Sequence, residues 1–493
     1  MILPLYIIIP LFTAFLITLI AGKKDTWGVV LSLLSALALV VLAVISFFKL
    51  NGETLVYQVG GWQLPFGIVM VLDSLSAFML IIVNLVALTS LFYSIQYIRH
   101  LSPDWRYYGL FMLMLSGMNG VIITGDLFNL YVYMEIALLA AFALVAYGSR
   151  AQEFEAAFKY AIMGAVSSII ILIGIGVTYS ATSTLTLAKI AQVLPEKNPE
   201  ITMWLGGFFL AGFGLKAAVM PFHAWLPDAH SSAPAPISSM LSGVLIKVLG
   251  IYVIIRLFFN VFDAPAVLLT IITILGIVSI VAAGLLSIIQ WDFKRLLAYS
   301  SISQIGYILL GLGLGTPLAI LGALFHLFNH AMFKSLLFYN AGSIEMSLGT
   351  RELKEMGKVS QLLPVTSGTS MIGSLAISGI PPFNGFFSKL IIIIAAIATG
   401  HVWLAVLAII GSILTLAAVM KFQRYSLRRD VDVEPTGEKT GFAMNTAMVF
   451  LAAICILGGL LLVPGIKEST LDPVVNVVFE KAEYVQLVLG RSL

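Results

Sequence analysis

The stretch APISSMLSGVLIKVLGIYVIIRLF, residues 235–258, decides the fold, because it is almost wholly apolar and carries Lys247 at its middle. It exceeds the ~20 residues that a helix needs to cross the hydrocarbon of a bilayer. A cationic side chain near the bilayer centre costs roughly 2.5 to 3.5 kcal/mol on insertion scales, so it is retained mainly where it is paired, hydrated or used to move ions. The stretch therefore predicts a membrane helix with a polar function.

Three further lysines, Lys216, Lys334 and Lys389, interrupt apolar stretches in the same way. Together the four lysines cost about 10 to 14 kcal/mol, which is comparable with the net stability of a typical fold, about 5 to 15 kcal/mol. For Lys216, Lys247 and Lys389 the simpler explanation is a long side chain that extends to the headgroup layer. Their repetition favours instead a pathway for protons or cations.

The composition extends this interpretation to all 493 residues, of which 60% are hydrophobic and 10% charged. Soluble domains carry about 25% charged residues. The sequence predicts an all-α polytopic membrane protein, a single integral domain over 1–493 with about fourteen transmembrane helices and a C-terminal tail, 464–493, with a weak signal for a surface helix. The predicted spans are 2–21, 28–48, 69–92, 107–124, 127–148, 157–180, 201–222, 235–258, 265–290, 296–314, 317–340, 362–398, 402–424 and 441–463.

Basic residues indicate the orientation, since Lys and Arg concentrate in cytoplasmic connections. With the N-terminus outside, the connection that holds Lys23 and Lys24 is cytoplasmic, and most basic residues of the connections fall on that side. Both termini are then predicted on the outer side. The first span, 2–21, has no basic leading region or small-residue cleavage site, so we expect a retained span rather than a signal peptide.

Two segments five spans apart resemble each other: GLKAAVMPFHAW at 214–225 and IPPFNGFFSK at 380–389 both join lysine, proline and glycine. An offset of five spans reverses the direction of travel across the membrane. The pattern therefore predicts two inverted repeats of five helices, spans 4–8 over 107–258 and spans 9–13 over 265–424.

Prolines fall inside two of the predicted spans, Pro221 in the seventh and Pro381 with Pro382 in the twelfth. A proline inside a helix removes a backbone hydrogen bond, and the freed carbonyls must then be taken up by protein or water. We therefore expect helices 7 and 12 to be broken beside their lysines.

Glu135, within YVYMEIALL at 131–139, is the acidic residue that falls in mid-span, so it is the natural partner of a buried lysine. Burial favours the neutral form of both groups, whereas an opposite charge nearby favours the charged forms, so the protonation of each depends on its partner. Such a pair is predicted to act as a proton switch. The alternative is a static ion pair that fixes helix packing.

The segment HLFNHAMFK places His326, His330 and Lys334 at i, i+4 and i+8, on one helix face. We call this row of three side chains the file. Histidine titrates near neutrality, so the file is predicted to relay protons, with a purely structural hydrogen-bonding role as the alternative. Two histidines one turn apart also fit zinc, but no third ligand accompanies them, and bis-histidine haem needs facing helices. The single cysteine, Cys455, offers no thiolate set, so no metal or cofactor is predicted.

Four residues near span ends are weaker candidates for proton entry or exit: His223, Asp228, His230 and Asp126. Asp228 and His230 are expected in a cytoplasmic loop after the seventh span, and Asp126 at the outer mouth of the fifth. Loop carboxylates more often form caps or turns, which is the alternative here. Asp73, near the outer end of the third span, is expected to be structural.

At this point the sequence resembles the antiporter-like membrane subunits shared by Mrp-type multisubunit cation/proton antiporters and the membrane arm of NADH-quinone oxidoreductase. The resemblance covers roughly residues 65–425 and is carried by six segments. They are DLFNLYVYME at 126–135, KAAVMPFHAWLPDAHSSAP at 216–234, GVLIK at 243–247, WDFKRLLAYSSISQ at 291–304, HLFNHAMFK at 326–334 and GFFSK at 385–389.

This resemblance implies two inverted half-channels joined by a hydrated polar axis. It implies that Glu135 pairs with Lys216, that Lys247 and the histidines of 326–334 relay protons, and that Lys389 opens towards the outside. Chain length, the short tail and the residues around Glu135 are most similar to the D-type subunits of Mrp complexes.

The implied function is a proton-translocating subunit of a Na⁺/H⁺ antiporter in the bacterial plasma membrane, a transporter subunit rather than an enzyme. Its partners would be other hydrophobic subunits of the same complex and the lipid bilayer, without a redox cofactor. No basic block suggests nucleic acid. Three alternatives stay open: a proton-pumping subunit of a redox-driven oxidoreductase, a scaffold with static ion pairs, and an autonomous carrier.

Overall fold

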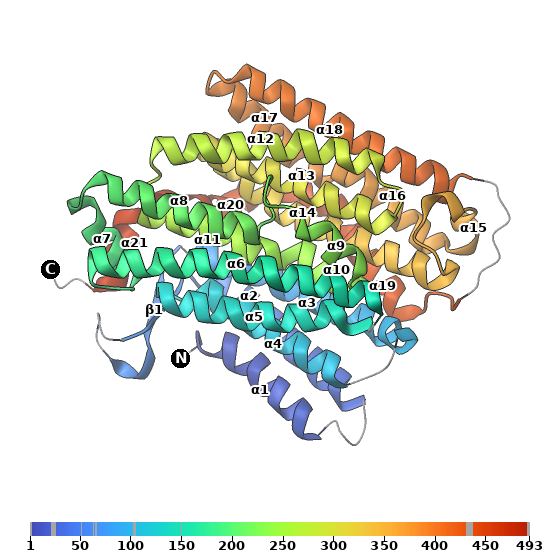
Figure 1. Ribbon diagram of the computed structural model, residues 1–493, viewed down its shortest axis with the longest axis horizontal. Coiled ribbons are helices and arrows are strands. Elements are labelled where there is room, and N and C mark those ends of the chain that lie inside the picture. Colours follow the sequence, from blue (N-terminus) through green and yellow to red (C-terminus); the bar gives the residue numbers. More distant parts are fainter. Residues whose placement is uncertain are drawn as a thin grey trace.

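The computed structural model is a bundle of long helices that run side by side along its longest axis (Figure 1). Among the residues that it describes, ten helices are long and apolar enough to cross a membrane, and α1 (Leu5–Ile20) and α17 (Asn384–Ala398) are shorter apolar helices. The predicted polytopic helical fold is confirmed, whereas the count of fourteen crossings stays a prediction. The described residues are 2–20, 26–50, 52–62, 64, 67–101, 105–148, 150–429 and 437–490.

Each predicted span overlaps a helix of the structure. In the N-terminal half these are α1, α2 (Thr26–Leu50), α3 (Ser74–Leu101), α4 (Trp105–Ile123), α5 (Leu127–Val145), α6 (Ala151–Thr182) and α8 (Pro199–Lys216), which α9 (Trp225–Ser232) continues. A continuous helical segment follows, built from α10 (Ala235–Met240), α11 (Val253–Ile255) and the π-helical turns η5 (Leu241–Leu245), η6 (Lys247–Tyr252) and η7 (Arg256–Val261). The C-terminal half contains α12 (Ala266–Ile289), α13 (Phe293–Leu314), α14 (Pro317–Leu348), α16 (Pro364–Ser378), α17, α18 (Val402–Phe422) with η9 (Gln423–Leu427), and α19 (Phe442–Leu457).

Several shorter elements connect or follow the long helices, and one of them, a two-stranded hairpin, is not helical. Strands β1 (Leu55–Gln58) and β2 (Val69–Leu72) form an antiparallel hairpin. The predicted tail forms two helices, and the first packs its apolar face inwards. The remaining elements are η2 (Val59–Gly61), η3 (Ala146–Gly148), α7 (Leu187–Val193), η4 (Leu194–Glu196), η8 (Leu353–Glu355), α15 (Val359–Leu362), η10 (Gly458–Leu462), α20 (Pro464–Phe479) and α21 (Lys481–Leu489).

The two chain ends lie at the same end of the bundle, on the left in Figure 1. The prediction that both termini lie on the outer side of the membrane stays a prediction, and Lys23 and Lys24, on which the orientation depends, fall outside the described residues.

The seventh predicted span is interrupted, as the position of Pro221 predicts. Helix α8 ends at Lys216 and α9 begins at Trp225. Backbone groups freed by the break find side-chain partners: the indole Nε1 of Trp225 donates to the carbonyl of Leu215 at 3.0 Å, and the backbone N–H of Met220 donates to Ser279 Oγ at 3.1 Å. These backbone groups at the break therefore have hydrogen-bond partners within the protein, as a membrane interior requires.

The twelfth predicted span is interrupted at Pro381 and Pro382, between α16 and α17. Here the group that satisfies a freed carbonyl is a lysine, since Lys389 Nζ donates to the carbonyl of Ile377 at 2.8 Å. Both breaks thus lie beside the lysines that the sequence analysis associates with them.

Aspartates begin two helices that lie five spans apart. Asp126 caps α5 by accepting a hydrogen bond from the backbone of Asn129 at 2.8 Å, and Asp292 caps α13 by accepting one from Arg295 at 2.9 Å. Each aspartate also forms an isolated antiparallel bridge with the segment after the following helix, Asp126 with Thr186 and Asp292 with Glu352. A repeat with an offset of five spans would produce this recurrence.

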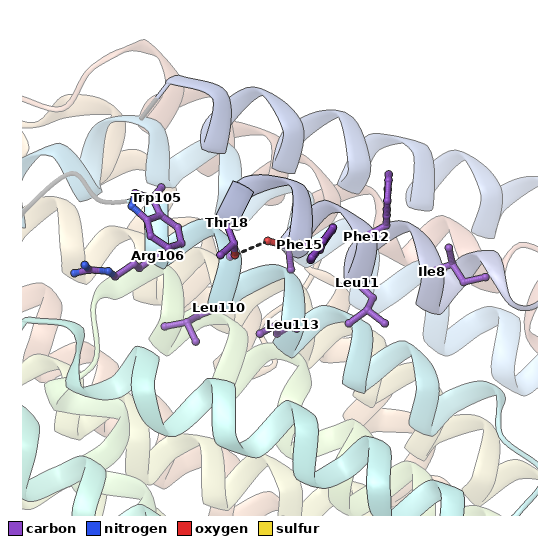
Figure 2. A pocket seen from close by; sticks show the side chains of 11 residues that line it. Ile8, Leu11, Phe12, Phe15, Thr18, Trp105, Arg106, Leu110 and Leu113 are labelled. Atoms are coloured by element: carbon purple, nitrogen blue, oxygen red, sulfur yellow. Dashed lines mark hydrogen bonds between the residues drawn. The ribbon is translucent and has the colours of Figure 1, made fainter. Parts of the chain in front are cut away.

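The described residues that line a groove of about 750 Å³ between α1 and α4 include neither an acidic residue nor a histidine (Figure 2). Trp105 and Arg106 lie at one end of it. In a bilayer such a mostly apolar surface is covered by acyl chains or by another helix. Its other lining residues are Ile8, Leu11, Phe12, Ala14, Phe15, Thr18, Gly109, Leu110 and Leu113.

A buried ion pair ties the start of α3 to η7. The Arg256 guanidinium donates to Asp73 Oδ1 and, at 2.8 Å, to Ser76 Oγ, and the side chains of Asp73 and Arg256 are only 1% and 6% exposed. This geometry fits the structural role expected of Asp73.

Replacing Asp73 with Asn is expected to destabilise the protein by about 3 to 5 kcal/mol, because it leaves the Arg256 cation buried without its counterion. Thermal unfolding of the purified protein measures this as a lowered midpoint. The control is Asp263→Asn, which removes an 80% exposed carboxylate 3.9 Å from Lys481 and is expected to change little. Equal midpoints for Asp73→Asn and the wild type would contradict this account.

Candidate functional site

Glu135, Ser168 and Lys216 meet where α5, α6 and the end of α8 come together. The Ser168 hydroxyl contacts Glu135 Oε1 and lies 2.9 Å from Lys216 Nζ, which also donates to the carbonyl of Gly164 at 2.9 Å. Lys216 Nζ is 3.9 Å from Glu135 Oε1. The structure thus brings together the predicted carboxylate and amine. It adds a bridging hydroxyl, which both donates and accepts hydrogen bonds and which the sequence analysis missed.

Lys247 is fully buried in η6, and its ammonium group is held by its own helix. Its Nζ donates to the carbonyls of Ser242 and Gly243, each at 2.6 Å. Among the residues that the structure describes, no carboxylate forms an ion pair with this amine. Carbonyl dipoles therefore stabilise its charged form without a counterion.

The break after α8 packs directly against this lysine's helix. A Cβ at Gly250 would lie 2.9 Å from the backbone of Ala217, the residue that follows Lys216. A side chain at this position would separate the two segments. The close approach places the Glu135 and Lys216 pair next to the segment that carries Lys247.

His326 and His330 stack on α14, with ring centroids 6.2 Å apart and planes inclined by 14°. His326 Nδ1 lies 2.9 Å from Ser388 Oγ on α17. The other nitrogen of His326 and both nitrogens of His330 are buried and have no hydrogen-bond partner among the described protein atoms. Because buried polar groups are almost always hydrogen-bonded, these nitrogens predict ordered water along the file.

Lys334 ends the α14 file and is completely buried. Its Nζ donates to the carbonyl of Leu297 at 2.7 Å and to Ser300 Oγ at 2.5 Å, both on α13. His330 lies within electrostatic range of Lys334, Lys247 and Lys389, so one buried region gathers these groups from η6, α14 and α17.

Lys389, whose amine satisfies the break before α17, is only 2% exposed. Its Nζ lies 4.6 Å from the centroid of the Tyr307 ring, next to a cavity of about 270 Å³ that also reaches Gly379 and Ser412. The alternative of a side chain extended to the surface does not describe this lysine, because its amine points inwards to a carbonyl and an aromatic face.

Two of the weaker candidates occupy local structural positions. Asp126 is the cap of α5, and burial raises the pKa of its carboxyl group. His223 lies in the break, half-buried, with Nδ1 3.2 Å from the carbonyl of Pro221. Asp126 thus occupies a capping position, the alternative to a role in proton entry or exit.

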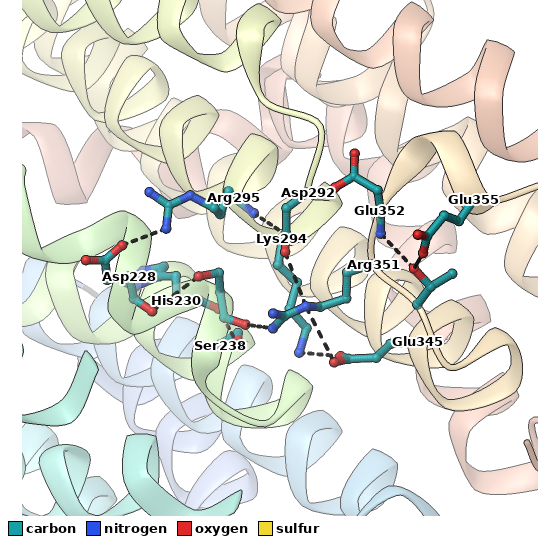
Figure 3. Close-up of polar contacts among 12 residues, drawn as sticks. Asp228, His230, Ser238, Asp292, Lys294, Arg295, Glu345, Arg351, Glu352 and Glu355 are labelled. Atoms are coloured by element: carbon teal, nitrogen blue, oxygen red, sulfur yellow. Dashed lines mark hydrogen bonds and ion pairs between the residues drawn. The ribbon is translucent and has the colours of Figure 1, made fainter. Parts of the chain in front are cut away.

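The expectation that Asp228 and His230 lie in a loop is wrong, because both belong to α9, which resumes the broken helix. Their cytoplasmic side stays a prediction. A proline is tolerated in the first turn of a helix, so Pro227 does not prevent this. Asp228 forms an ion pair with Arg295 at 2.6 Å (Figure 3). It forms another with Lys159 at 2.9 Å.

His230 is fully buried between the rings of Trp225 and Phe338, whose centroids lie 6.1 and 6.0 Å from its own. Both of its ring nitrogens have no partner among the described protein atoms. It lies within electrostatic range of Lys334 and Lys247, so it borders the buried file rather than a loop.

The fold and site define a class: polytopic membrane proteins with two broken helices and a buried file of lysines and histidines between them. A family model described as "NADH:quinone oxidoreductase/Mrp antiporter, TM" matches residues 124–415, and one described as "NADH-Ubiquinone oxidoreductase (complex I), chain 5 N-terminus" matches residues 57–111. The chain belongs to the NADH:quinone oxidoreductase/Mrp antiporter family of membrane proteins.

Two curated relatives cover most of the chain. It is 37% identical to the N-type subunit of NADH-quinone oxidoreductase from Desulforudis audaxviator over 83% of either chain. It is 34% identical to the D-type Na(+)/H(+) antiporter subunit of Alkalihalophilus pseudofirmus over 87% of its own length and 88% of the relative's. The resemblance to the D-type subunits of Mrp complexes is therefore confirmed, and the redox alternative has relatives as well.

Two solved structures share the fold over 99% of either chain. A chain of the Mrp complex from Dietzia sp. DQ12-45-1b superposes with a TM-score of 0.91 at 26% identity. A chain of the membrane-bound sulfane sulfur reductase, an archaeal respiratory membrane complex, superposes with a TM-score of 0.90 at 29% identity. The fold is thus common to an antiporter complex and a respiratory complex.

Proposed function

We propose that this chain is the proton-translocating subunit of a multisubunit Na⁺/H⁺ antiporter of the bacterial plasma membrane. The contact among Glu135, Ser168 and Lys216 carries the proposal. A static ion pair would place the amine directly against the carboxylate, whereas here the two are 3.9 Å apart with a hydroxyl between them. A carboxylate and an amine so joined exchange a proton and change each other's charge.

From this pair the proposed route continues through the contact of Gly250 with the break to Lys247. It then follows His330 and His326 to Lys389 and the cavity beside it. The recurrence of capped helices and breaks five spans apart supports two inverted half-channels, 107–258 and 265–424. Unpartnered ring nitrogens along the route support its hydration.

The surroundings of Glu135 support an assembly with other membrane subunits. Its side chain is 29% exposed, and it shares a face of α5 with Phe128, Val132 and Leu139, which are 46%, 37% and 65% exposed. A carboxylate facing lipid is costly, so another protein chain is expected to cover this face. Relatives named as antiporter subunits are consistent with such partners.

Coupling to a sodium ion that crosses elsewhere in the complex is energetically reasonable. Moving one charge through 100 mV is worth about 2.3 kcal/mol, which corresponds to a pKa change of under two units at about 1.36 kcal/mol each. Reconstituted complex is expected to turn a sodium gradient into a pH change that a fluorescent dye reports. The absence of any sodium-dependent pH change would contradict antiport.

A second candidate function is a membrane subunit of a redox-driven proton pump. It is favoured by the 37% identity to an oxidoreductase subunit and by the fold shared with a respiratory complex. Purifying the native complex decides between the two. Small hydrophobic subunits of the Mrp type support the antiporter, whereas iron–sulfur and flavin subunits support the pump.

Replacing Ser168 with Ala is expected to slow proton translocation roughly tenfold, the kinetic equivalent of about 1.4 kcal/mol, which approaches the value of a hydrogen bond to a charged group. Dye-reported proton flux in vesicles measures it. The matched control is Ser180→Ala, an exposed serine of the same helix, which should leave the flux unchanged. Full flux in Ser168→Ala would show that the hydroxyl is dispensable.

A further inference from the structure

A second buried acid–base pair lies outside this file, at the end of the bundle where α13 begins and α14 ends (Figure 3). Lys294 Nζ is 2.6 Å from Glu345 Oε2. The Arg351 side chain borders the pair, with Nε 3.7 Å from Glu345 Oε1 and 3.2 Å from Asp292 Oδ2. Lys294 falls between the predicted spans 265–290 and 296–314, yet its side chain is only 2% exposed.

A polar cavity of about 270 Å³ borders this pair. Its lining includes Tyr97, Arg150 and Ser232, together with Lys294, Glu345 and Arg351. That volume holds several water molecules, since each occupies about 30 Å³ in the liquid. Both residues line the cavity, and the Glu345 side chain is 25% exposed whereas that of Lys294 is 2% exposed, so the acid is the more accessible member of the pair.

Helix α13 connects the pair with the buried file. One turn beyond Lys294, the carbonyl of Leu297 accepts a hydrogen bond from Lys334 Nζ at 2.7 Å, and Ser300 Oγ accepts another at 2.5 Å. In the other direction, Lys294 Nζ donates to the carbonyl of Ala233, in the turn between α9 and α10, at 3.2 Å. Lys294 therefore stands between the cavity and Lys334.

The same helix leads to Lys247 as well. Ser301 Oγ lies 2.7 Å from Ser242 Oγ, and the carbonyl of Ser242 accepts a hydrogen bond from Lys247 Nζ at 2.6 Å. Glu345 follows Lys334 by eleven residues on α14, an interval close to three whole turns, so both side chains lie on one helix face. Helices α13 and α14 thus both carry polar side chains between the cavity and the file.

We infer that Lys294 and Glu345 form the site at which protons enter the file from this cavity. The inference rests on the proposed function. In the first step the Lys294 ammonium gives its proton, by way of the Ser300 hydroxyl and water, to the neutral amine of Lys334, which becomes an ammonium. Lys294 is then neutral, and Glu345 keeps Arg351 as its remaining close cationic partner.

The next steps restore the pair. A hydronium ion in the cavity protonates the Glu345 carboxylate and leaves as water. The resulting carboxylic acid passes the proton to the Lys294 amine, which becomes an ammonium, and Glu345 is a carboxylate again. One proton has moved from the cavity to Lys334, and both members of the pair have returned to their starting charge.

Substituting Lys294 by Arg separates this relay from a static ion pair. Arginine keeps the positive charge and the contact with Glu345, but it does not give up its proton. Proton flux in vesicles with the assembled complex is expected to fall at least tenfold in Lys294→Arg, without a lower thermal midpoint. The control, Lys354→Arg, changes an exposed lysine at the same end of the bundle and should keep full flux.

Two further variants complete the test. The proton flux of Glu345→Gln is expected to be as low as that of Lys294→Arg. Glu345→Asp is expected to keep part of the flux, because aspartate retains a titratable group and glutamine does not. Full flux in either Lys294→Arg or Glu345→Gln would overturn the inference. If Glu135→Gln stops transport in the same assay while Lys294→Arg does not, only the entry site is wrong; full flux in Glu135→Gln would overturn the proposed function itself.

Discussion

Replacing Glu135 with Gln is expected to abolish proton translocation, with a loss of at least a hundredfold. The amide has the shape of the acid and still accepts a hydrogen bond from Ser168, but it has no exchangeable carboxyl proton. Positioned acid–base groups contribute about 10²- to 10⁴-fold to the rates of proton transfer, so removing the acid of the Glu135 and Lys216 pair should stop transport almost completely.

The measurement is sodium-dependent proton flux in vesicles that contain the assembled complex, with assembly confirmed on native gels. Glu155→Gln is the matched control, because Glu155 is an exposed glutamate of α6 whose carboxylate pairs with Lys159 at 2.7 Å. It should transport normally. Unchanged flux in Glu135→Gln would defeat the assignment of this residue.

Replacing Lys247 with Met is expected to stop transport while leaving stability equal or higher. Methionine has a similar length and no charge, and the lysine that it replaces is buried with only two carbonyls as partners. Exchanging a buried ion for an apolar side chain is often neutral or stabilising. A lysine kept only for packing would give the opposite pattern, with lower stability and intact transport.

The two readouts are thermal unfolding of the purified complex and proton flux in vesicles. Lys197→Met, at an exposed position before α8, controls for the loss of a lysine. Normal flux in a variant that neutralises Lys216, Lys247 and Lys389 together would support the alternative of a scaffold with static ion pairs.

Apolar runs and prolines were enough to predict the helices and both breaks. The length of an apolar run and the backbone hydrogen bond that a proline lacks are both local properties of the sequence. A mid-span carboxylate has few possible partners, so the pairing of Glu135 with a buried lysine was predictable from the residues, whereas the choice of Lys216 among the four lysines came from the family resemblance. The bridging role of Ser168 was not, because hydroxyls are frequent in membrane helices and only the packing of α5, α6 and α8 selects this one.

Residues near span ends were the least predictable. Lys294 and His230 were assigned to connections because each lies close to a run of polar residues, yet the structure buries both. Burial at a helix end depends on which neighbouring helices extend past it, here α9, α10 and α14, and sequence distance from an apolar run carries no such information. The short spacing of Lys294 from Asp292, a predictable cap, was the available signal that α13 begins before this lysine.

The central claim is that a hydrated row of ionisable groups crosses the protein between the two helix breaks. A cryo-EM map of the assembled complex, at a resolution that shows ordered water, tests it most directly. The account predicts water within hydrogen-bonding distance of His326 Nε2 and of both ring nitrogens of His330. Dry apolar packing around these nitrogens, with the amines of Lys247 and Lys389 turned towards lipid headgroups, would contradict it.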